Sequence, residues 1–184
     1  LALWSRIDGF ERDALHGALR KGTVVRAMLM RATLHVVSRK QYAALRPVLD
    51  DVMTRAMTGA LKGRDQGLDL EKVLPAAERL LAKRPRTFNE LRAELSGRFP
   101  KVNERALGYA VRTQLPLAMV PSDDEWAFPR DAEFAPAKVR LRKAHSEALV
   151  RAHLAAFDPD PAADGQPWSA VVSRCPSLRS KTMI

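Results

Sequence analysis

Basic residues recur in this chain at spacings that could build a phosphate-binding surface. Two β-prone runs, Val24–Met30 and Thr33–Val37, follow each other closely, and they predict a β-hairpin. Three side chains lie among the apolar residues of these runs: Arg26, Arg31 and His35. Because the planar guanidinium matches the geometry of phosphate, arginines along a hairpin indicate contact with a polyanion.

A second set of polar residues lies on a helix predicted over about 103–114. Arg105, Tyr109 and Arg112 are spaced i, i+4 and i+7, so they share one face of that helix. Asn103 is a good N-cap for it. Since arginine can bind guanine edges or phosphate, we expect this face and its cap to contact DNA. The alternative is a solvated face on which Glu104 balances the charge.

A basic turn precedes another predicted helix. Arg84 and Arg86 lie directly before its N-terminus, with Lys83 beside them. Helix N-termini favour phosphate, so we include both arginines in the predicted DNA-binding set. The alternative is a charged loop that is simply solvated.

The hairpin residues also have two interpretations. Strand alternation places His35 on the face of Thr33 and Val37, where it could hydrogen-bond a phosphate or a flipped nucleotide. It could equally be a structural histidine bonded to the backbone, and both alternatives stay open. We favour phosphate contact for Arg31, at the turn, and a structural ion pair with Asp50 or Asp51 for Arg26.

The composition supports a polyanionic partner. The 184 residues carry a net charge of +10, with 46% hydrophobic and 28% charged residues. Residues 1–50 hold nine Lys/Arg against four Asp/Glu, and most of the cations in the chain are arginines. A basic surface of this kind indicates nucleic acid, although it also serves solubility.

Other function classes receive little support. The single Cys175 allows no internal disulfide and no cysteine-based metal cluster, and the four histidines are scattered. No apolar run approaches a membrane span and no signal peptide is apparent. We therefore expect a cytoplasmic protein without a metal ion or small-molecule cofactor; the sequence does not indicate its oligomeric state.

Hydrophobic periodicity predicts an α+β fold that is predominantly helical. Helices are expected at 11–21, from about 40 with a break at Pro47, and then at 70–83, 88–97 and 103–114. Ser38 and Thr87 are expected N-caps. A hairpin of Leu117–Val120 and Trp126–Phe128 would follow. Helix, helix, helix and hairpin is the order of a winged helix, whose third helix is the recognition element.

We divide the chain into four parts on this basis. Residues 1–58 form a partial first winged-helix unit, 59–69 a glycine-containing linker, and 70–138 a central winged helix. Residues 139–184 begin a third unit with a helix over 139–157 and end in a disordered tail. The predicted architecture is therefore a tandem of winged helices.

Four segments of the chain resemble a known family, in the family's order. They are Leu3–Arg6, Val25–Arg26, Leu29–Val37 with its Met-Arg-x-Thr-Leu-His core, and Leu149–Phe157. They are similar to the winged-helix DNA-binding family that includes the bacterial AlkZ/YcaQ-type DNA glycosylases. The resemblance implies winged-helix units in tandem around a basic DNA-binding channel.

The same resemblance bears on catalysis. In the glycosylase members, base excision rests on a glutamine-containing motif upstream of the segment that matches Leu3–Arg6. This sequence begins at that segment and loses the family pattern after Ser173. We therefore expect a middle piece of a longer or decayed protein, without enzyme activity of its own.

These observations predict binding to duplex DNA, mainly through backbone phosphates. One alternative is a fragment or relative of a DNA-repair glycosylase that acts on alkylated or crosslinked bases. Another is a winged-helix module for protein contacts, because Asp123, Asp124 and Glu125 make the predicted wing tip acidic and repel phosphate.

Overall fold

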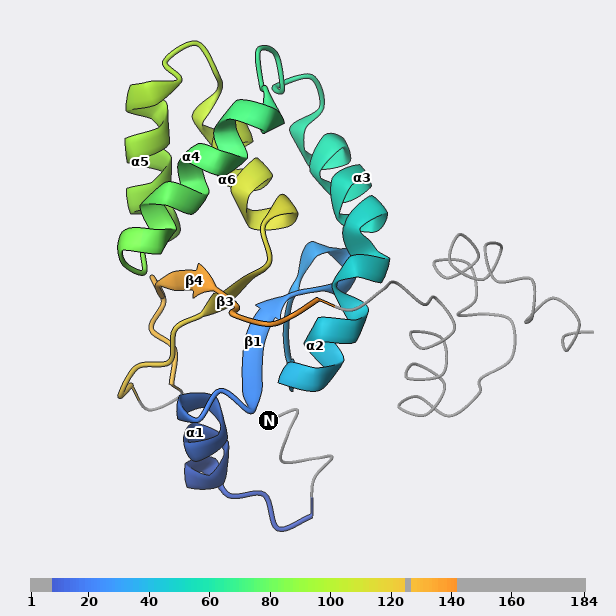
Figure 1. Cartoon of the computed structure of the whole chain (residues 1–184), viewed down its shortest axis with the longest axis vertical. Coiled ribbons are helices and arrows are strands. Elements are labelled where there is room, and N and C mark those ends of the chain that lie inside the picture. The colour runs from blue at the N-terminus through green and yellow to red at the C-terminus, as the bar shows by residue number, and fades with distance from the viewer. Residues whose placement is uncertain (1–7, 125–126, 142–184) are drawn as a thin grey trace, which may run out of the picture.

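The computed structural model describes residues 8–124 and 127–141, which form a mainly helical α+β fold (Figure 1). The predicted fold class is confirmed. The elements, with η for 3-10 helices, are α1 (Arg12–Arg20), β1 (Val24–Met28), η1 (Met30–Ala32), β2 (Leu34–Ser38), α2 (Arg39–Leu45), η2 (Pro47–Leu49), α3 (Asp50–Leu61), α4 (Leu70–Lys83), α5 (Phe88–Arg98), α6 (Glu104–Gln114), β3 (Leu117–Met119) and β4 (Phe134–Pro136).

The predicted N-terminal hairpin is present, and local signals fix both of its flanks. Gly22 adopts φ +65° and ends α1, with its amide donating to Leu19 and the Thr23 amide donating to Ala18. Strands β1 and β2 then pair antiparallel around η1. Ser38 begins α2 through a capping box with Gln41.

The sheet joins strands that are distant in the sequence. Its order is β2-β1-β3-β4, and the only ladder pair between β1 and β3 in the described structure is Ala27 with Ala118. Beyond the β3–β4 ladder, the Val120 amide donates to the Glu133 carbonyl at 2.8 Å. The N-terminal hairpin is therefore continuous with the wing hairpin.

Residues 70–136 have a winged-helix-like arrangement. Arg86, between α4 and α5, forms an isolated antiparallel bridge with Phe134 of β4. Apolar side chains of α4, α5, α6, β3 and β4 share one core, which includes Leu80, Leu95 and Leu107. Figure 1 shows these three helices together, above the small β3–β4 hairpin.

The return strand predicted at 126–128 is wrong for residues 127 and 128, the two that the structure describes. Ala127 is a bend with φ +63°, its amide donates to Asp124, and its carbonyl accepts from Ser122. Trp126 lies outside the described residues. The strand that pairs with β3 is β4, which the sequence hides because Pro136 lies within it and proline is rare in strands.

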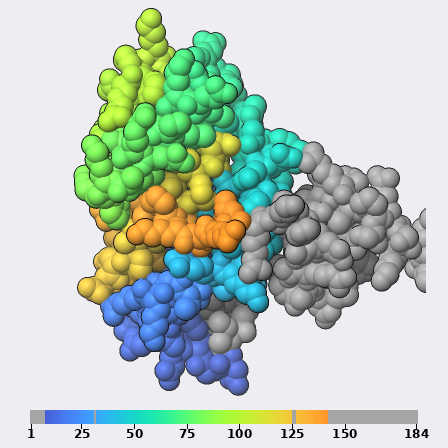
Figure 2. Space-filling view, in the orientation of Figure 1, coloured from blue at the N-terminus to red at the C-terminus, as the bar shows by residue number. Residues whose placement is uncertain are grey.

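A second core lies under the N-terminal hairpin. It joins β1, α2 and α3 through residues that include Met28, Tyr42 and Met53, and Ala137 from the end of the wing packs into it. Between the two cores, Met57 and Leu61 of α3 pack on two small side chains of α6, Ala106 and Ala110. In Figure 2 the segment 134–141 crosses the middle of the visible face, between the α4–α5 side and the N-terminal elements.

Buried Arg46 links the two cores by hydrogen bonds. Its Nη2 donates to the carbonyls of Thr113 and Gln114 at 2.7 and 3.0 Å, at the end of α6, and its Nη1 pairs with Asp50. Arg46 is only 2% exposed. Burial raises the pKa of its neighbour Tyr42 to about 12, although the nearby Arg46 charge opposes the rise.

Two helix boundaries differ from those that the sequence predicted, and other predicted boundaries are not tested. Helix α3 continues through Gly59 to Leu61, and residues 62–69 connect it to α4. The described part of the helix expected at 139–157, residues 139–141, is not helical. The C-terminal tail that was expected to be disordered lies outside the described residues. The four-part division of the chain stays a prediction.

Candidate nucleic-acid interface

A groove between α5 and α6, here called the α5–α6 groove, brings together the polar face predicted on α6. It has a volume of about 350 Å³. Its described lining consists of Phe88, Arg92, Arg105, Gly108, Tyr109 and Arg112. Three of these six residues are arginines, so the groove is strongly basic.

The helical spacing on α6 explains how three of these residues meet. Arg105 is exposed, while Tyr109 and Arg112 are half-buried along the same face. The opposite face carries Leu107 and Val111, which are fully buried. Core packing of that apolar face therefore turns the polar face outward.

Aromatic rings support two of the arginines. The Arg105 guanidinium carbon lies 5.6 Å from the centre of the Tyr109 ring, and that of Arg112 lies 5.8 Å from the centre of the Phe88 ring. Phe88 is fixed in turn by Phe134 of β4, with ring centroids 4.2 Å apart. Both guanidinium groups are thus held at the groove by cation–π contacts.

Arg92 of α5 is a groove residue that the sequence analysis missed. It donates to Asn89 and lies 3.6 Å from a Glu104 carboxylate oxygen. Its side chain crosses Gly108, where an added Cβ would lie 2.9 Å from Arg92 Cδ. A glycine within a predicted helix often marks such a close approach, so Gly108 was the available signal.

Two polar residues near the ends of α6 make structural hydrogen bonds. Asn103 is exposed and accepts from the Arg105 amide at 2.9 Å, as expected for the N-cap. Thr113 appeared polar in the sequence, but it is fully buried and donates to the Tyr109 carbonyl. The face available to a ligand therefore ends near Arg112.

The two arginines of the basic turn differ in their surroundings. Arg84 is half-exposed and pairs with Glu90 at 2.7 Å. The hydrogen bond from Arg84, followed by the Thr87 amide, lowers the pKa of Glu90 to about 2. Arg86 is buried, where it donates to the Leu80 carbonyl and pairs with Glu94, so we omit it from the proposed interface.

The hairpin residues lie in a different part of the fold. Arg31 belongs to η1, between β1 and β2. His35 Nε2 lies 2.9 Å from Thr33 Oγ1 and 3.2 Å from the Met30 carbonyl oxygen, which is the geometry of a structural histidine. The Arg26 guanidinium lies over the Phe128 ring, with its carbon 5.0 Å from the ring centre. The DNA-binding roles of Arg31 and His35 stay predictions.

The acidic wing contacts the N-terminal helix. Asp123 accepts a hydrogen bond from Arg20 of α1 at 2.6 Å, and in Figure 1 the wing loop extends toward α1. This exposed ion pair gives the acidic side chain an intramolecular partner, although such pairs are weak. Glu125 lies outside the described residues.

Comparison with known proteins identifies the family to which this chain belongs. The family model of AlkZ-like DNA glycosylases matches residues 1–179, and the chain belongs to this family. This family indicates a role in DNA binding or DNA repair. No curated protein and no solved structure matches the chain.

Two kinds of feature are absent from residues 8–124 and 127–141. None of their helices is long and apolar enough to cross a bilayer. No group of three or more histidine, cysteine, aspartate or glutamate side chains among them is placed to hold a metal ion.

Proposed function

We propose that this protein binds duplex DNA through contacts to backbone phosphates, with the α5–α6 groove as the first contact surface. The observation that carries the proposal is the convergence of Arg92, Arg105 and Arg112 on one groove of a winged-helix-like fold. Arginine contacts of this kind position a protein on the duplex without reading its sequence. Membership of the AlkZ-like family supports DNA as the partner.

The groove also has features suited to more than phosphate. Tyr109 offers an aromatic ring beside the arginines, and bases that leave the duplex stack on such rings. A repair role in which this surface holds DNA during excision of an alkylated or crosslinked base is therefore the second candidate. The family match favours it, and an assay for release of alkylated bases from DNA tests it.

Fluorescence anisotropy of labelled duplex DNA, titrated across salt, tests the first proposal. The wild-type protein should bind with an affinity that falls steeply with salt. Arg105→Gln with Arg112→Gln should weaken binding roughly tenfold, because two charge-assisted contacts are lost, and should reduce the salt slope by about 2.

The matched control is Lys62→Gln with Arg64→Gln, two exposed cations in the connector between α3 and α4. This variant loses the same charge and should lose much less affinity. Equal losses in the two variants would show that the effect comes from net charge alone, and the groove would not be the contact surface.

A further inference from the structure

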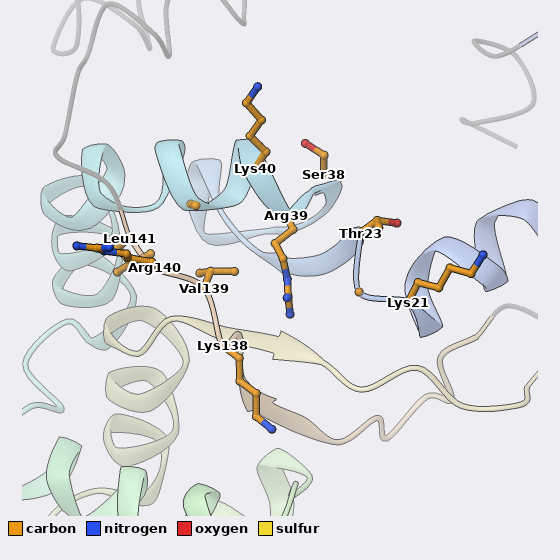
Figure 3. Close-up of a pocket in the computed structure, with 11 residues that line it drawn as sticks. Lys21, Thr23, Ser38, Arg39, Lys40, Lys138, Val139, Arg140 and Leu141 are labelled. Carbon is orange, nitrogen blue, oxygen red and sulfur yellow. The ribbon is translucent and has the colours of Figure 1, made fainter.

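A second basic pocket lies on other elements of the molecule, next to the start of α2 (Figure 3). We call it the α2 pocket, and its volume is about 1020 Å³. Five of its eleven described lining residues are cationic: Lys21, Arg39, Lys40, Lys138 and Arg140. No aspartate or glutamate is among them, so its charge is unopposed within the described lining.

Three segments of the chain meet at this pocket. Lys21 comes from the end of α1, and Arg39 and Lys40 from the first turn of α2. Lys138 and Arg140 come from the segment that follows β4. None of these five makes an ion pair within the part of the chain that the structure describes, in contrast to Arg84 or Arg86.

The segment after β4 is held so that its cations face outward. Ala137 is buried in the core beside α2, and Val139 packs against the same core. Lys138, between them, has a left-handed backbone with φ +48° and is exposed, as is Arg140. Core packing on alternate residues thus fixes two cations at the pocket.

Arg39 closes the remaining side. In Figure 3 it points from the start of α2 toward the segment 138–141, whereas Lys40 extends away from that segment. Its Nη2 lies 3.5 Å from the Ala137 carbonyl, and the same nitrogen lies 3.4 Å from the position of an added Cβ at Gly22. The absent side chain at Gly22 therefore leaves room for the guanidinium.

The lining identifies the chemistry of the occupant. Pockets for small organic ligands are lined mainly by apolar and aromatic side chains, whereas the described lining of this pocket has no aromatic ring and five cations. Clustered cations without carboxylates create a strong positive potential, which attracts phosphate groups. The open size suits a polymer strand better than a single phosphate ion.

We infer that the α2 pocket binds a DNA strand through its backbone phosphates, as a second contact site separate from the α5–α6 groove. The inference rests on the proposed function for its choice of DNA, but it uses different residues. It also assigns a role to the segment 138–141, of which residues 139–141 were expected to begin a helix.

Two variants of equal charge test the site. Arg39→Gln, Lys138→Gln and Arg140→Gln remove three pocket cations, while Lys62→Gln, Arg64→Gln and Lys101→Gln remove three exposed cations elsewhere. The pocket variant should lose at least tenfold more affinity for a labelled duplex than the control, with a salt slope smaller by about 2 to 3. Equal losses would overturn the assignment.

A second measurement uses the wild-type protein and needs no variant. Lysine acetylation with a soluble reagent, read by mass spectrometry, should slow at least threefold at Lys21 and Lys138 when duplex DNA is bound. Lys62 and Lys101 should keep their rates. Unchanged labelling of Lys138 in the complex would overturn the inference.

Together, the groove variant and the lysine labelling distinguish failure of the proposed function from failure of the pocket inference. If Arg105→Gln with Arg112→Gln weakens binding and Lys138 is not protected, the proposed function stands and the pocket inference fails. If Lys138 is protected and the groove variant equals its control, the pocket stands and the groove fails. If inorganic tripolyphosphate slows acetylation of Lys138 and DNA does not, the pocket binds a free polyphosphate instead.

Discussion

The α5–α6 groove and the α2 pocket are both basic, but their cations are held in different ways. In the groove, Arg105 and Arg112 lie over aromatic rings, and Arg92 faces Glu104. In the pocket, lysines and arginines converge without a ring or a carboxylate among the described lining residues. The groove is therefore organised before a ligand arrives, whereas the pocket has charge that only a ligand can offset.

This difference predicts different contributions to binding. Preorganised arginines lose little side-chain freedom when they bind, so they favour defined contacts. Flexible exposed lysines contribute mainly through counterion release, which depends steeply on salt. We expect the groove to set the position of DNA on the protein and the pocket to add salt-sensitive affinity.

The largest expected effect comes from Arg46, which connects the two halves that carry these surfaces. Arg46→Met keeps much of the side-chain volume but leaves the buried carbonyls of Thr113 and Gln114 without their donor. The free energy of unfolding should fall by about 2 to 4 kcal/mol, measured by urea denaturation. Arg55→Met, at an exposed position on α3, should change it by less than about 0.5 kcal/mol. A loss no greater than that of the control would mean that Arg46 does not hold α6 against α2.

A combined variant asks whether both surfaces contact the same DNA. Replacing the two groove arginines and the three pocket cations with glutamine should multiply the separate losses of affinity, to roughly a hundredfold, because distant sites act additively. Anisotropy with one duplex measures it. The matched control has glutamine at five exposed cations: Arg55, Lys62, Arg64, Arg79 and Lys101. The groove variant and the pocket variant are the two parents of the combined variant. If the combined variant binds DNA as tightly as the weaker-binding parent, the groove and the pocket do not act as independent contacts.

Tyr109 tests whether a ring is needed to position an arginine. Tyr109→Leu removes the face on which Arg105 lies, and DNA affinity should fall about two- to fivefold, the size of an exposed cation–π contact. Tyr109→Phe keeps the ring and should bind as the wild type does. A loss with phenylalanine equal to that with leucine would instead give the role to the tyrosine hydroxyl.

The features that the sequence predicted correctly are those that depend on short local patterns. Ser38, Thr87 and Asn103 cap the helices that they were expected to begin, because side-chain oxygens before an apolar period are strong local signals. The shared face of Arg105, Tyr109 and Arg112 followed from helical spacing alone. Both features need only a few neighbouring residues.

The features that the sequence missed depend on tertiary packing. Arg86 was expected to contact phosphate from the basic turn, but its backbone bridge to Phe134 places it inside the fold. Arg92 reaches the groove because two helices approach at Gly108. The α2 pocket combines Lys21 with Lys138, which are more than a hundred positions apart in the chain. Such pairings cannot be read from periodicity.

The smallest expected effect concerns Arg84, a predicted phosphate contact that is half-exposed and paired with a carboxylate. Glu90→Gln removes the paired charge while leaving an oxygen that can accept the Thr87 amide. Because the folded pKa of Glu90, about 2, is below its ordinary value of 4.5, ionised Glu90 stabilises the fold above pH 4.5. That contribution is lost as the pH falls toward 2. Urea midpoints of the wild type and the variant should therefore differ near pH 6 and converge near pH 2.

The same variant leaves Arg84 with only its longer ion pair, 4.0 Å to Glu133, and so frees Nη2 for DNA. Its affinity for duplex DNA should rise by at most about twofold over that of Glu78→Gln, an exposed position on α4 that loses the same charge. Equal affinities of the two variants would mean that Arg84 does not reach the phosphates even without its partner. The arginines of the basic turn would then make no phosphate contact, since Arg86 is buried.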